Sequence, residues 1–283
     1  MVSISVSADS TKVTIFGHGL KVRDRFEFSE GIYLSSRINP LDIETTAEGC
    51  THFSDYAAAL NGNEIASFLV EIEDARGGKS LASKAWNSLW LFHLLSVACR
   101  SPCFLLYSAS DGKKPRFSAT TKNPFVYPLT KIHTASSDQL EWAQKYKETF
   151  DDLILNPEFS SAMRCYGNSH YLPDNAVRIM LLWAGIEGLL SVDGELNRRL
   201  ALYSALMLNG SAKDKIEYFD YVKKSYAIRS RAVHGGNISP KKMEQGYKSA
   251  SEILIGLLAR CVEIGRVPKP AELDLLAVSA TIN

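Results

Sequence analysis

The chain has 283 residues, and its 32 Lys and Arg nearly balance its 31 Asp and Glu. Hydrophobic residues make up 46% and charged residues 22%, proportions that exclude a disordered or low-complexity chain. The balance also excludes a broad positive coat for non-specific nucleic-acid binding, although a confined basic patch is compatible with it.

Membrane, disulfide and metal signals are missing from the sequence. The most apolar stretches, 88–99 and 179–192, are shorter than the roughly 18 to 20 residues that cross a bilayer. Residues 1–10 lack the layout of a signal peptide. The five cysteines form no C-x-x-C pair and have no zinc-type spacing with histidine, so we expect buried thiols. The sequence thus predicts a cytoplasmic protein with no membrane partner, metal or cofactor.

Short strands are predicted first along the chain. In the first forty residues apolar positions such as Val13 and Ile15 alternate with polar ones, and glycines stand at turn positions. Helical spacing follows over 56–76 and 81–100. Residues 104–107 are four consecutive apolar residues, which indicates a buried strand.

A turn-rich stretch with Pro124 and Pro128 then marks a domain boundary, which we place between residues 135 and 136. Beyond it the spacing is helical, with expected helices at 137–155, 173–190, 195–208, 212–234 and 240–264. The expected fold class is α+β. Residues 1–135 form a mixed α+β domain of unknown role, and residues 136–283 form an all-α bundle.

One arginine occupies a position that the helical spacing reserves for apolar side chains. Phe219, Val222, Tyr226, Arg229 and Val233 follow each other in steps of three and four, so they share one stripe of a helix. An unpaired guanidinium in a core is very unfavourable. Arg229 must therefore pair with an acid, lie at an interface, or face a water-filled cleft.

His234 follows Arg229 by five residues. In a regular helix their side chains would point roughly 140° apart, about 7.5 Å apart along the axis. They converge only if the helix distorts at Gly235-Gly236, or if two copies of the chain share one site. A neutral imidazole and a guanidinium on one phosphodiester would suit metal-free RNA cleavage, because histidine can take the 2′-hydroxyl proton while arginine stabilises the phosphate charge.

The spacing alone is weak evidence for such a site. With 14 arginines and 6 histidines, about one pair in which four to six residues separate Arg from a following His is expected by chance. A second match, Arg164 to His170, is indeed present in a stretch rich in Gly, Asn and Ser.

The surrounding residues make the first match more specific. Residues 226–236, YAIRSRAVHGG, resemble the end of the signature helix in the Apea-like branch of the HEPN superfamily. The upstream segments 183–190 and 195–202 are similar to the two preceding helices of that family, in the same order. The resemblance covers residues 136–265. Its last motif is more specific than the Arg–His spacing, because many positions agree and not only the arginine and the histidine.

This resemblance implies a helical bundle that dimerises through its signature helices, with Arg and His from both chains lining one cleft. Active members of the family are metal-independent endoribonucleases, which leave 2′,3′-cyclic phosphate and 5′-hydroxyl ends and often act as toxins or in antiphage defence. The resemblance further implies that Arg229 and His234 are catalytic, that RNA is the substrate, and that an antitoxin or defence-system protein is a possible partner. Many active relatives have Asn, Asp or His after the arginine, where this chain has Ser230.

Further residues are expected to support the site or bind substrate, and each has an ordinary alternative role. Glu187 would orient Arg229 or His234, or form a structural ion pair. Arg199 would reach a phosphate or cap a neighbouring helix. The remaining expected supporting residues are Tyr226, Ser230 and Arg231. Several lysines close to the motif would bind phosphate or form a solvated face, namely Lys223, Lys224, Lys241 and Lys242.

Two other functions stay open. The chain is alternatively a non-catalytic HEPN module that binds a nucleotide or a protein, or a purely structural bundle in which Arg229 is an interface arginine. Residues 195–248 contain 11 basic and 5 acidic residues. This local excess is compatible with a confined site that attracts phosphate.

Overall fold

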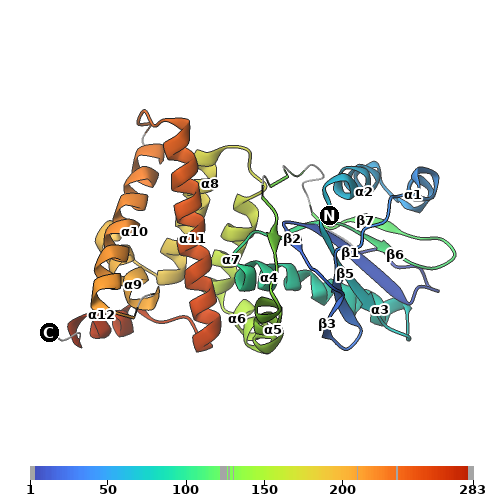
Figure 1. Ribbon diagram of the computed structural model, residues 1–283, viewed down its shortest axis with the longest axis horizontal. Coiled ribbons are helices and arrows are strands. Elements are labelled where there is room, and N and C mark those ends of the chain that lie inside the picture. Colours follow the sequence, from blue (N-terminus) through green and yellow to red (C-terminus); the bar gives the residue numbers. More distant parts are fainter. Residues whose placement is uncertain are drawn as a thin grey trace. The chain divides into compact units, whose positions relative to one another are not determined.

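The computed structural model describes residues 4–121, 126, 128–129, 131–208, 210–233 and 235–279 (Figure 1). The chain divides into two compact units, Met1–Lys145 and Tyr146–Asn283. The first is mixed α and β, and the second is helical throughout its described secondary structure. None of the helices that the structure describes is both long and apolar enough to span a bilayer.

A six-stranded antiparallel sheet forms the centre of the first unit, with the strand order β3-β4-β5-β1-β6-β7. Two further short strands, β2 and β8, pair in parallel. The strand bounds are β1 Lys12–His18, β2 Leu20–Lys21, β3 Phe26–Ser29, β4 Ile32–Ser35, β5 Phe68–Glu73, β6 Phe104–Ser110, β7 Phe117–Ala119 and β8 His133–Thr134. The alternating segments around Val13 and Ile15 are strands, as predicted, and so are residues 104–107.

Helices cover both faces of this sheet. They are α1 Ile43–Gly49, α2 Phe53–Ile65, α3 Gly78–Asn87, the 3₁₀ turn Ser88–Trp90, α4 Leu91–Cys99 and α5 Ser137–Lys145. Phe16 stacks on Tyr107 at 4.3 Å between ring centroids and belongs to the cluster that includes Ala58 of α2. The next residue, Gly17, faces α4, where an added Cβ would lie 2.4 Å from the Phe92 ring. Consecutive residues of β1 thus serve opposite layers, because side chains alternate along a strand.

The predicted helix over 56–76 is wrong in its second half, which is the central strand β5. Phe68, Val70 and Ile72 point to one face and are buried, and Leu69 is buried on the other. A strand covered on both faces has no polar side, so its apolar run has the appearance of a buried helix in the sequence. The predicted helix over 81–100 is two helices joined by the 3₁₀ turn.

The second unit consists of helices α6 Lys147–Ile154, α7 Pro157–Ser169, α8 Asn175–Leu190, α9 Leu196–Leu208, α10 Ala212–Val233, α11 Pro240–Ile264 and α12 Pro270–Ser279. The helix expected at 240–264 has these bounds in the structure. The one expected at 137–155 is divided at Tyr146 into α5 and α6. α5 packs on α4 and belongs to the first unit, so the units divide after Lys145 rather than after residue 135.

Capping residues explain where several of these helices begin. The side chains of Asn156, Asp174 and Ser239 each accept a hydrogen bond from the third backbone N–H of the following helix. Proline occupies the first turn of α7 and α11. Pro173, which we expected in the first turn of α8, lies outside it because Asp174 is the N-cap.

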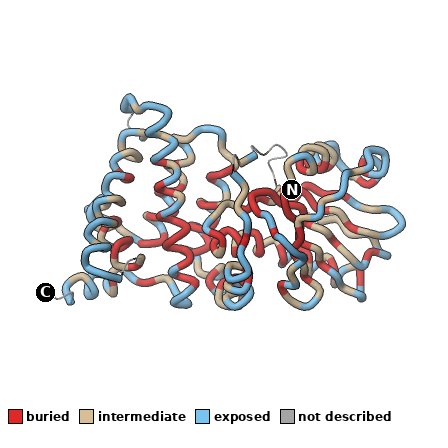
Figure 2. Tube along the Cα trace, viewed as in Figure 1, coloured by how far each residue is buried: buried red, intermediate tan, exposed pale blue. Residues whose placement is uncertain are grey.

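The core of the second unit lies between α7, α8 and α11, where buried positions run along most of α11 (Figure 2). Trp183 of α8 is fully buried. Gly185, two residues further along, lets α8 approach its neighbours, since a Cβ there would lie 2.9 Å from both Cys165 Cβ and Leu254 Cδ2. By contrast, α12 buries only Leu273 among its described side chains.

Two glycines of α8 should respond in opposite ways to alanine. Gly185→Ala should lower the free energy of unfolding by about 1–2 kcal/mol, because the overpacking exceeds the gain in helix propensity. Gly188 has no neighbour within 4 Å of an added Cβ, so Gly188→Ala should raise it by about 0.5–1 kcal/mol. Urea unfolding followed by tryptophan fluorescence measures the change in the free energy of unfolding for each variant. Trp183 is the single tryptophan of this unit. Equal shifts in the same direction would contradict the close approach at Gly185.

Candidate functional site

The stripe of α10 that contains Arg229 is buried in its middle and emerges from the bundle at its C-terminal end. Val222 is fully buried and Tyr226 is 9% exposed. The Arg229 side chain is 24% exposed, and Val233 in the last turn is 41% exposed. Arg229 therefore stands where the packed part of the helix meets solvent.

Arg229 packs with three other side chains from two helices, and we call these four residues the Arg229 layer. Trp183 and Glu187 are one turn apart on α8, and Tyr226 and Arg229 are one turn apart on α10. The Trp183 and Tyr226 rings meet edge to face at 5.0 Å. The guanidinium carbon of Arg229 lies 5.3 Å from the centre of the Tyr226 ring. The layer thus holds the arginine against an aromatic wall.

Glu187 supplies the opposite charge. Its Oε1 lies 3.2 Å from Arg229 Nη2, and its side chain is 22% exposed. Oε1 makes no hydrogen bond, so the contact has the distance of an ion pair without hydrogen-bond alignment. The Arg229 Nε is buried and likewise has no hydrogen-bond partner among the described residues. The guanidinium is therefore compensated in charge but only partly satisfied in hydrogen bonding.

Tyr226 feels both charges. Burial raises the pKa of its hydroxyl, while the positive charge of Arg229 opposes that rise and the carboxylate of Glu187 adds to it. The phenol stays protonated at neutral pH and acts as an aromatic neighbour of the guanidinium.

Arg199 is engaged elsewhere in the unit. Its guanidinium donates two hydrogen bonds to the hydroxyl of Tyr203, at 3.0 and 2.7 Å, and one each to Asp193 and Asp274. The Tyr203 hydroxyl also donates to Asp274 at 2.7 Å. The structure thus commits Arg199 to joining α9 and α12.

His234, the expected catalytic histidine, lies outside the residues that the structure describes. α10 is helical as far as Val233, and Gly235 has a φ of +71°. The Gly236 N–H donates to the Arg231 carbonyl at 2.9 Å, as at a helix C-terminus that ends on a left-handed glycine. The helix expected over 212–234 therefore ends within one residue of its predicted bound.

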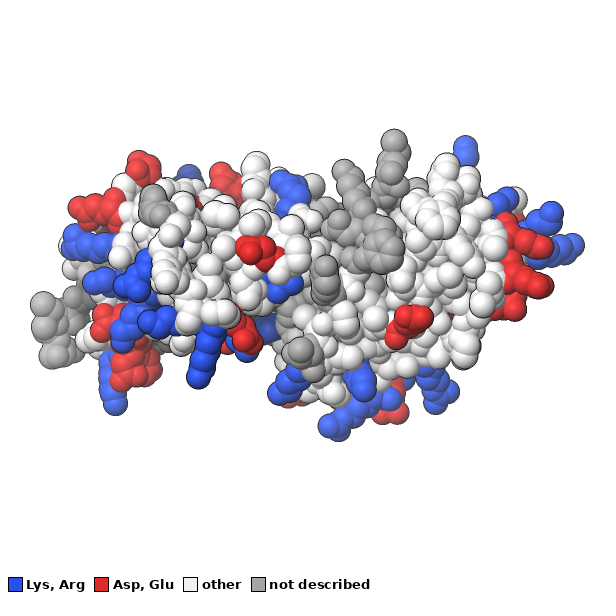
Figure 3. Space-filling view, turned by 90° about the horizontal axis from the view of Figure 1, so that it is seen from above, with Lys and Arg blue, Asp and Glu red and all other residues white. Residues whose placement is uncertain are grey.

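Cationic side chains without an acidic partner are distributed along α10 and at the start of α11. In the described part of the chain six basic residues of 195–248 form no ion pair, namely Lys215, Lys223, Lys224, Arg231, Lys241 and Lys242. Ser230 is half-buried and Arg231 is exposed. Figure 3, which views the molecule from the side where α10 meets α11, shows Lys and Arg on the helical unit with acidic side chains among them. A broad surface of one sign is not visible from this side.

The second Arg–His match does not form a comparable site. Arg164 is exposed on α7, whereas His170 is 3% exposed and hydrogen-bonded through Nδ1 to the Tyr247 hydroxyl. Burial lowers the pKa of His170 to about 3, and the charge of Arg178 contributes. Since a buried imidazole cannot reach an RNA backbone, this pair is structural.

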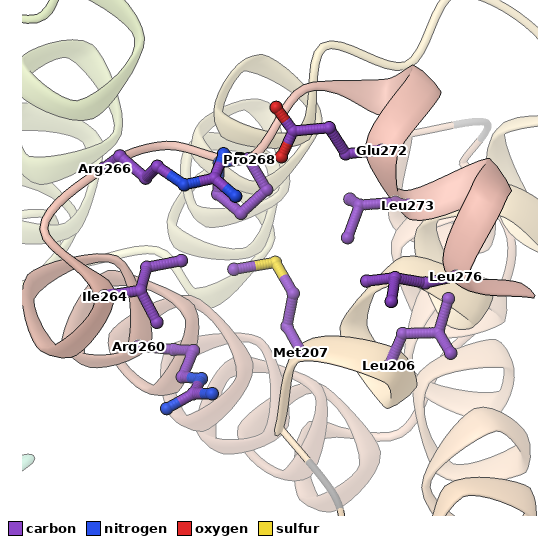
Figure 4. Close-up of a pocket in the computed structure, with 9 residues that line it drawn as sticks. All are labelled: Leu206, Met207, Arg260, Ile264, Arg266, Pro268, Glu272, Leu273 and Leu276. Atoms are coloured by element: carbon purple, nitrogen blue, oxygen red, sulfur yellow. Dashed lines mark hydrogen bonds and ion pairs between the residues drawn. The ribbon is translucent and has the colours of Figure 1, made fainter.

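Two pockets are separate from the Arg229 layer, because neither is lined by Arg229 or Glu187. The one in the helical unit, of about 130 Å³, is lined by Leu206, Met207, Arg260, Ile264, Arg266, Pro268, Glu272, Leu273 and Leu276 (Figure 4). The other, of about 510 Å³, is in the first unit near His18 and Leu129. Within the described residues, no three His, Cys, Asp or Glu side chains gather as a metal site requires.

Comparison with known proteins adds no relative. No protein-family model matches the sequence, and no curated protein and no solved structure is detectably similar to it.

The buried His170 should make the helical unit sensitive to acid. Its folded-state pKa of about 3 lies below the unfolded value of about 6.5, so between these pH values the unfolded chain binds more protons. Stability is therefore lost as the pH falls below about 6.5. We expect about 2 kcal/mol less stability at pH 5 than at pH 7 from this group.

Urea unfolding of the wild type and of His170→Gln at both pH values measures this contribution. The substitution should reduce the difference between pH 7 and pH 5 by about 2 kcal/mol, while the contribution of His93, whose pKa burial lowers to about 4, should remain. An undiminished difference would show that another group is responsible.

Proposed function

We propose that this protein is a metal-independent endoribonuclease of the HEPN type, with Arg229 and His234 as its catalytic residues. The observation that carries the proposal is the placement of Arg229, a half-buried cation held on an apolar stripe at the point where that stripe reaches solvent. Together with the motif of residues 226–236, this placement suits an arginine that meets a phosphate rather than one that fills a core.

The proposed chemistry needs one proton acceptor, one proton donor and one stabiliser of negative charge. The neutral imidazole of His234 removes the 2′-hydroxyl proton, and the resulting oxygen attacks the adjacent phosphorus. The bond to the 5′-oxygen breaks, and that oxygen takes a proton from an imidazolium. Arg229 stabilises the charge that develops on the non-bridging oxygens. The products are a 2′,3′-cyclic phosphate and a 5′-hydroxyl.

A homodimer would bring a second Arg–His pair to the same substrate, so that one histidine accepts the proton while the other donates one. Exposed apolar side chains near the two ends of α10 support this part of the proposal. Ile216 is 66% exposed and Val233 is 41% exposed on the same helix, and Phe219 between them is only half-buried. Large apolar side chains exposed along one helix are suited to contact with a second copy.

RNA cleavage in excess chelator tests the catalytic proposal. Wild-type protein should cut single-stranded RNA without added metal, and Arg229→Ala should reduce the rate by about 10²–10³-fold. His234→Ala should reduce it by about 10²–10⁴-fold. Analysis of the ends should show cyclic phosphate and 5′-hydroxyl groups.

Cleavage that stops on chelation, or that persists in both variants, would refute this mechanism. A protein that binds RNA or a nucleotide through Arg229 and never cuts it would instead be the non-catalytic module.

The dimer is tested by sedimentation equilibrium. The wild type should sediment as twice the chain mass of 31.3 kDa at micromolar concentration. Ile216→Glu places a charge near the exposed start of α10 and should weaken self-association at least about tenfold, because the charge would lose its hydration in the interface. The monomer should keep its stability, since the side chain is exposed in it. A monomeric wild type would exclude the dimer. An unaffected dimer in the variant would place the contact elsewhere on the protein.

A further inference from the structure

Glu187 contacts the part of Arg229 that a phosphate would have to reach. Its Oε1 lies 3.2 Å from Arg229 Nη2. Because the Arg229 Nε is buried, the terminal Nη nitrogens are the donors that remain for an incoming anion. The carboxylate therefore occupies the Nη2 side, one of the two terminal positions that a phosphate oxygen could take, and it carries the same sign of charge.

The contact itself is of a kind that can be exchanged. Glu187 Oε1 makes no hydrogen bond, so the pair lacks the two parallel N–H···O bonds of a bidentate arginine–carboxylate contact. Both side chains remain about one-quarter exposed, at 24% for Arg229 and 22% for Glu187. The contacting Oε1 is itself buried, so water reaches this oxygen only after the carboxylate separates from the guanidinium.

Arg229 does not depend on Glu187 alone for its position. Its guanidinium lies beside the Tyr226 ring, and Tyr226 is in turn fixed by the edge-to-face contact with the fully buried Trp183. These contacts remain when the carboxylate moves away. The arginine would stay packed against the aromatic wall with its Nη nitrogens free.

We propose that Glu187 is an internal competitor for Arg229, which neutralises the guanidinium in the free protein and is displaced by an RNA phosphate. Its role is to lower RNA affinity, so that binding requires a ligand able to replace a carboxylate. The inference rests on the proposed function, because it takes the RNA phosphate as the ligand of Arg229.

The test is the affinity of full-length protein for a fluorescently labelled 2′-O-methyl RNA of about twenty nucleotides, which keeps the phosphates and lacks the attacking hydroxyl. Glu187→Gln retains the shape of the side chain and removes its charge, so it should lower Kd about tenfold at 0.15 M salt. Glu187→Ala removes the same charge and should shift Kd in the same direction. Glu187→Asp keeps the charge and should not tighten binding.

Glu217→Gln is the matched control. Glu217 is also a carboxylate on an exposed helical surface, but it lies twelve residues before Arg229 on α10, about 18 Å along the axis. This separation exceeds the screening length of about 8 Å at this salt, so Kd should change less than twofold. Circular dichroism of every variant confirms that it is folded.

Weaker or unchanged binding in folded Glu187→Gln and Glu187→Ala would overturn the inference and show that the carboxylate positions Arg229 or only stabilises the bundle. Arg229→Ala separates this result from failure of the proposed function. If wild-type binding requires Arg229 but is not tightened by loss of Glu187, only the competitor role fails. If no variant binds RNA through Arg229, the proposed function fails and this inference fails with it.

Discussion

The charge of a half-buried arginine is the constraint on which this helical unit depends, because a guanidinium stays protonated in a protein and cannot escape by losing a proton. Arg229 has its stem on the apolar stripe of α10, so an acid has to lie within reach. Glu187 of α8 is that acid, and it lies one turn beyond the buried Trp183. The helix contact therefore combines apolar packing on one turn with charge compensation on the next.

Two half-buried arginines of the unit differ in how fully their N–H donors are hydrogen-bonded. Arg199 donates hydrogen bonds to Tyr203, Asp193 and Asp274, and its groups hold α12 against α9. Arg229 has an ion-pair contact through one nitrogen, and its buried Nε has no hydrogen-bond partner within the described residues. The Nη nitrogens of Arg229 have only the ion-pair contact with Glu187 and retain capacity for a ligand, whereas each nitrogen of Arg199 donates to a protein oxygen. This contrast favours Arg229 over Arg199 as a residue that binds substrate.

Much of this organisation could be predicted from local sequence. The bounds of α11 follow from Ser239, Pro240 and the apolar spacing between them and Gly265, which are signals contained within one segment. β5 could not be identified in this way, because burial on both faces removes the alternation that marks a strand. α7 was not predicted either, because Gly167, Asn168 and Ser169 make its end resemble a loop, although Asn156 and Pro157 begin a helix.

The site was predictable only in part, for a similar physical reason. The helical spacing predicted that Arg229 would occupy an apolar stripe and would pair with an acid, lie at an interface or face a cleft, but several acids lie within reach of a bundle. The choice of Glu187 depends on how α8 and α10 cross, which no local pattern specifies. Spacing alone likewise cannot distinguish Arg229 from Arg164, because a histidine follows each of them after five or six residues. The difference appears in three dimensions, where His170 is buried against Tyr247 and Arg164 is exposed to solvent.

The near-neutral total charge also has a structural explanation. Of the 11 basic residues in 195–248, five are paired with acids, and two of those, Arg199 and Arg229, use acids from outside the segment. The other six, which have no ion pair within the described residues, lie on α10 and in the first turn of α11. Their field is short-ranged at physiological salt, where the screening length is about 8 Å. Under the proposed function, RNA would therefore be attracted mainly close to the second half of α10 and the start of α11, where five of the six lie, and Arg229 would select the phosphate that is bound.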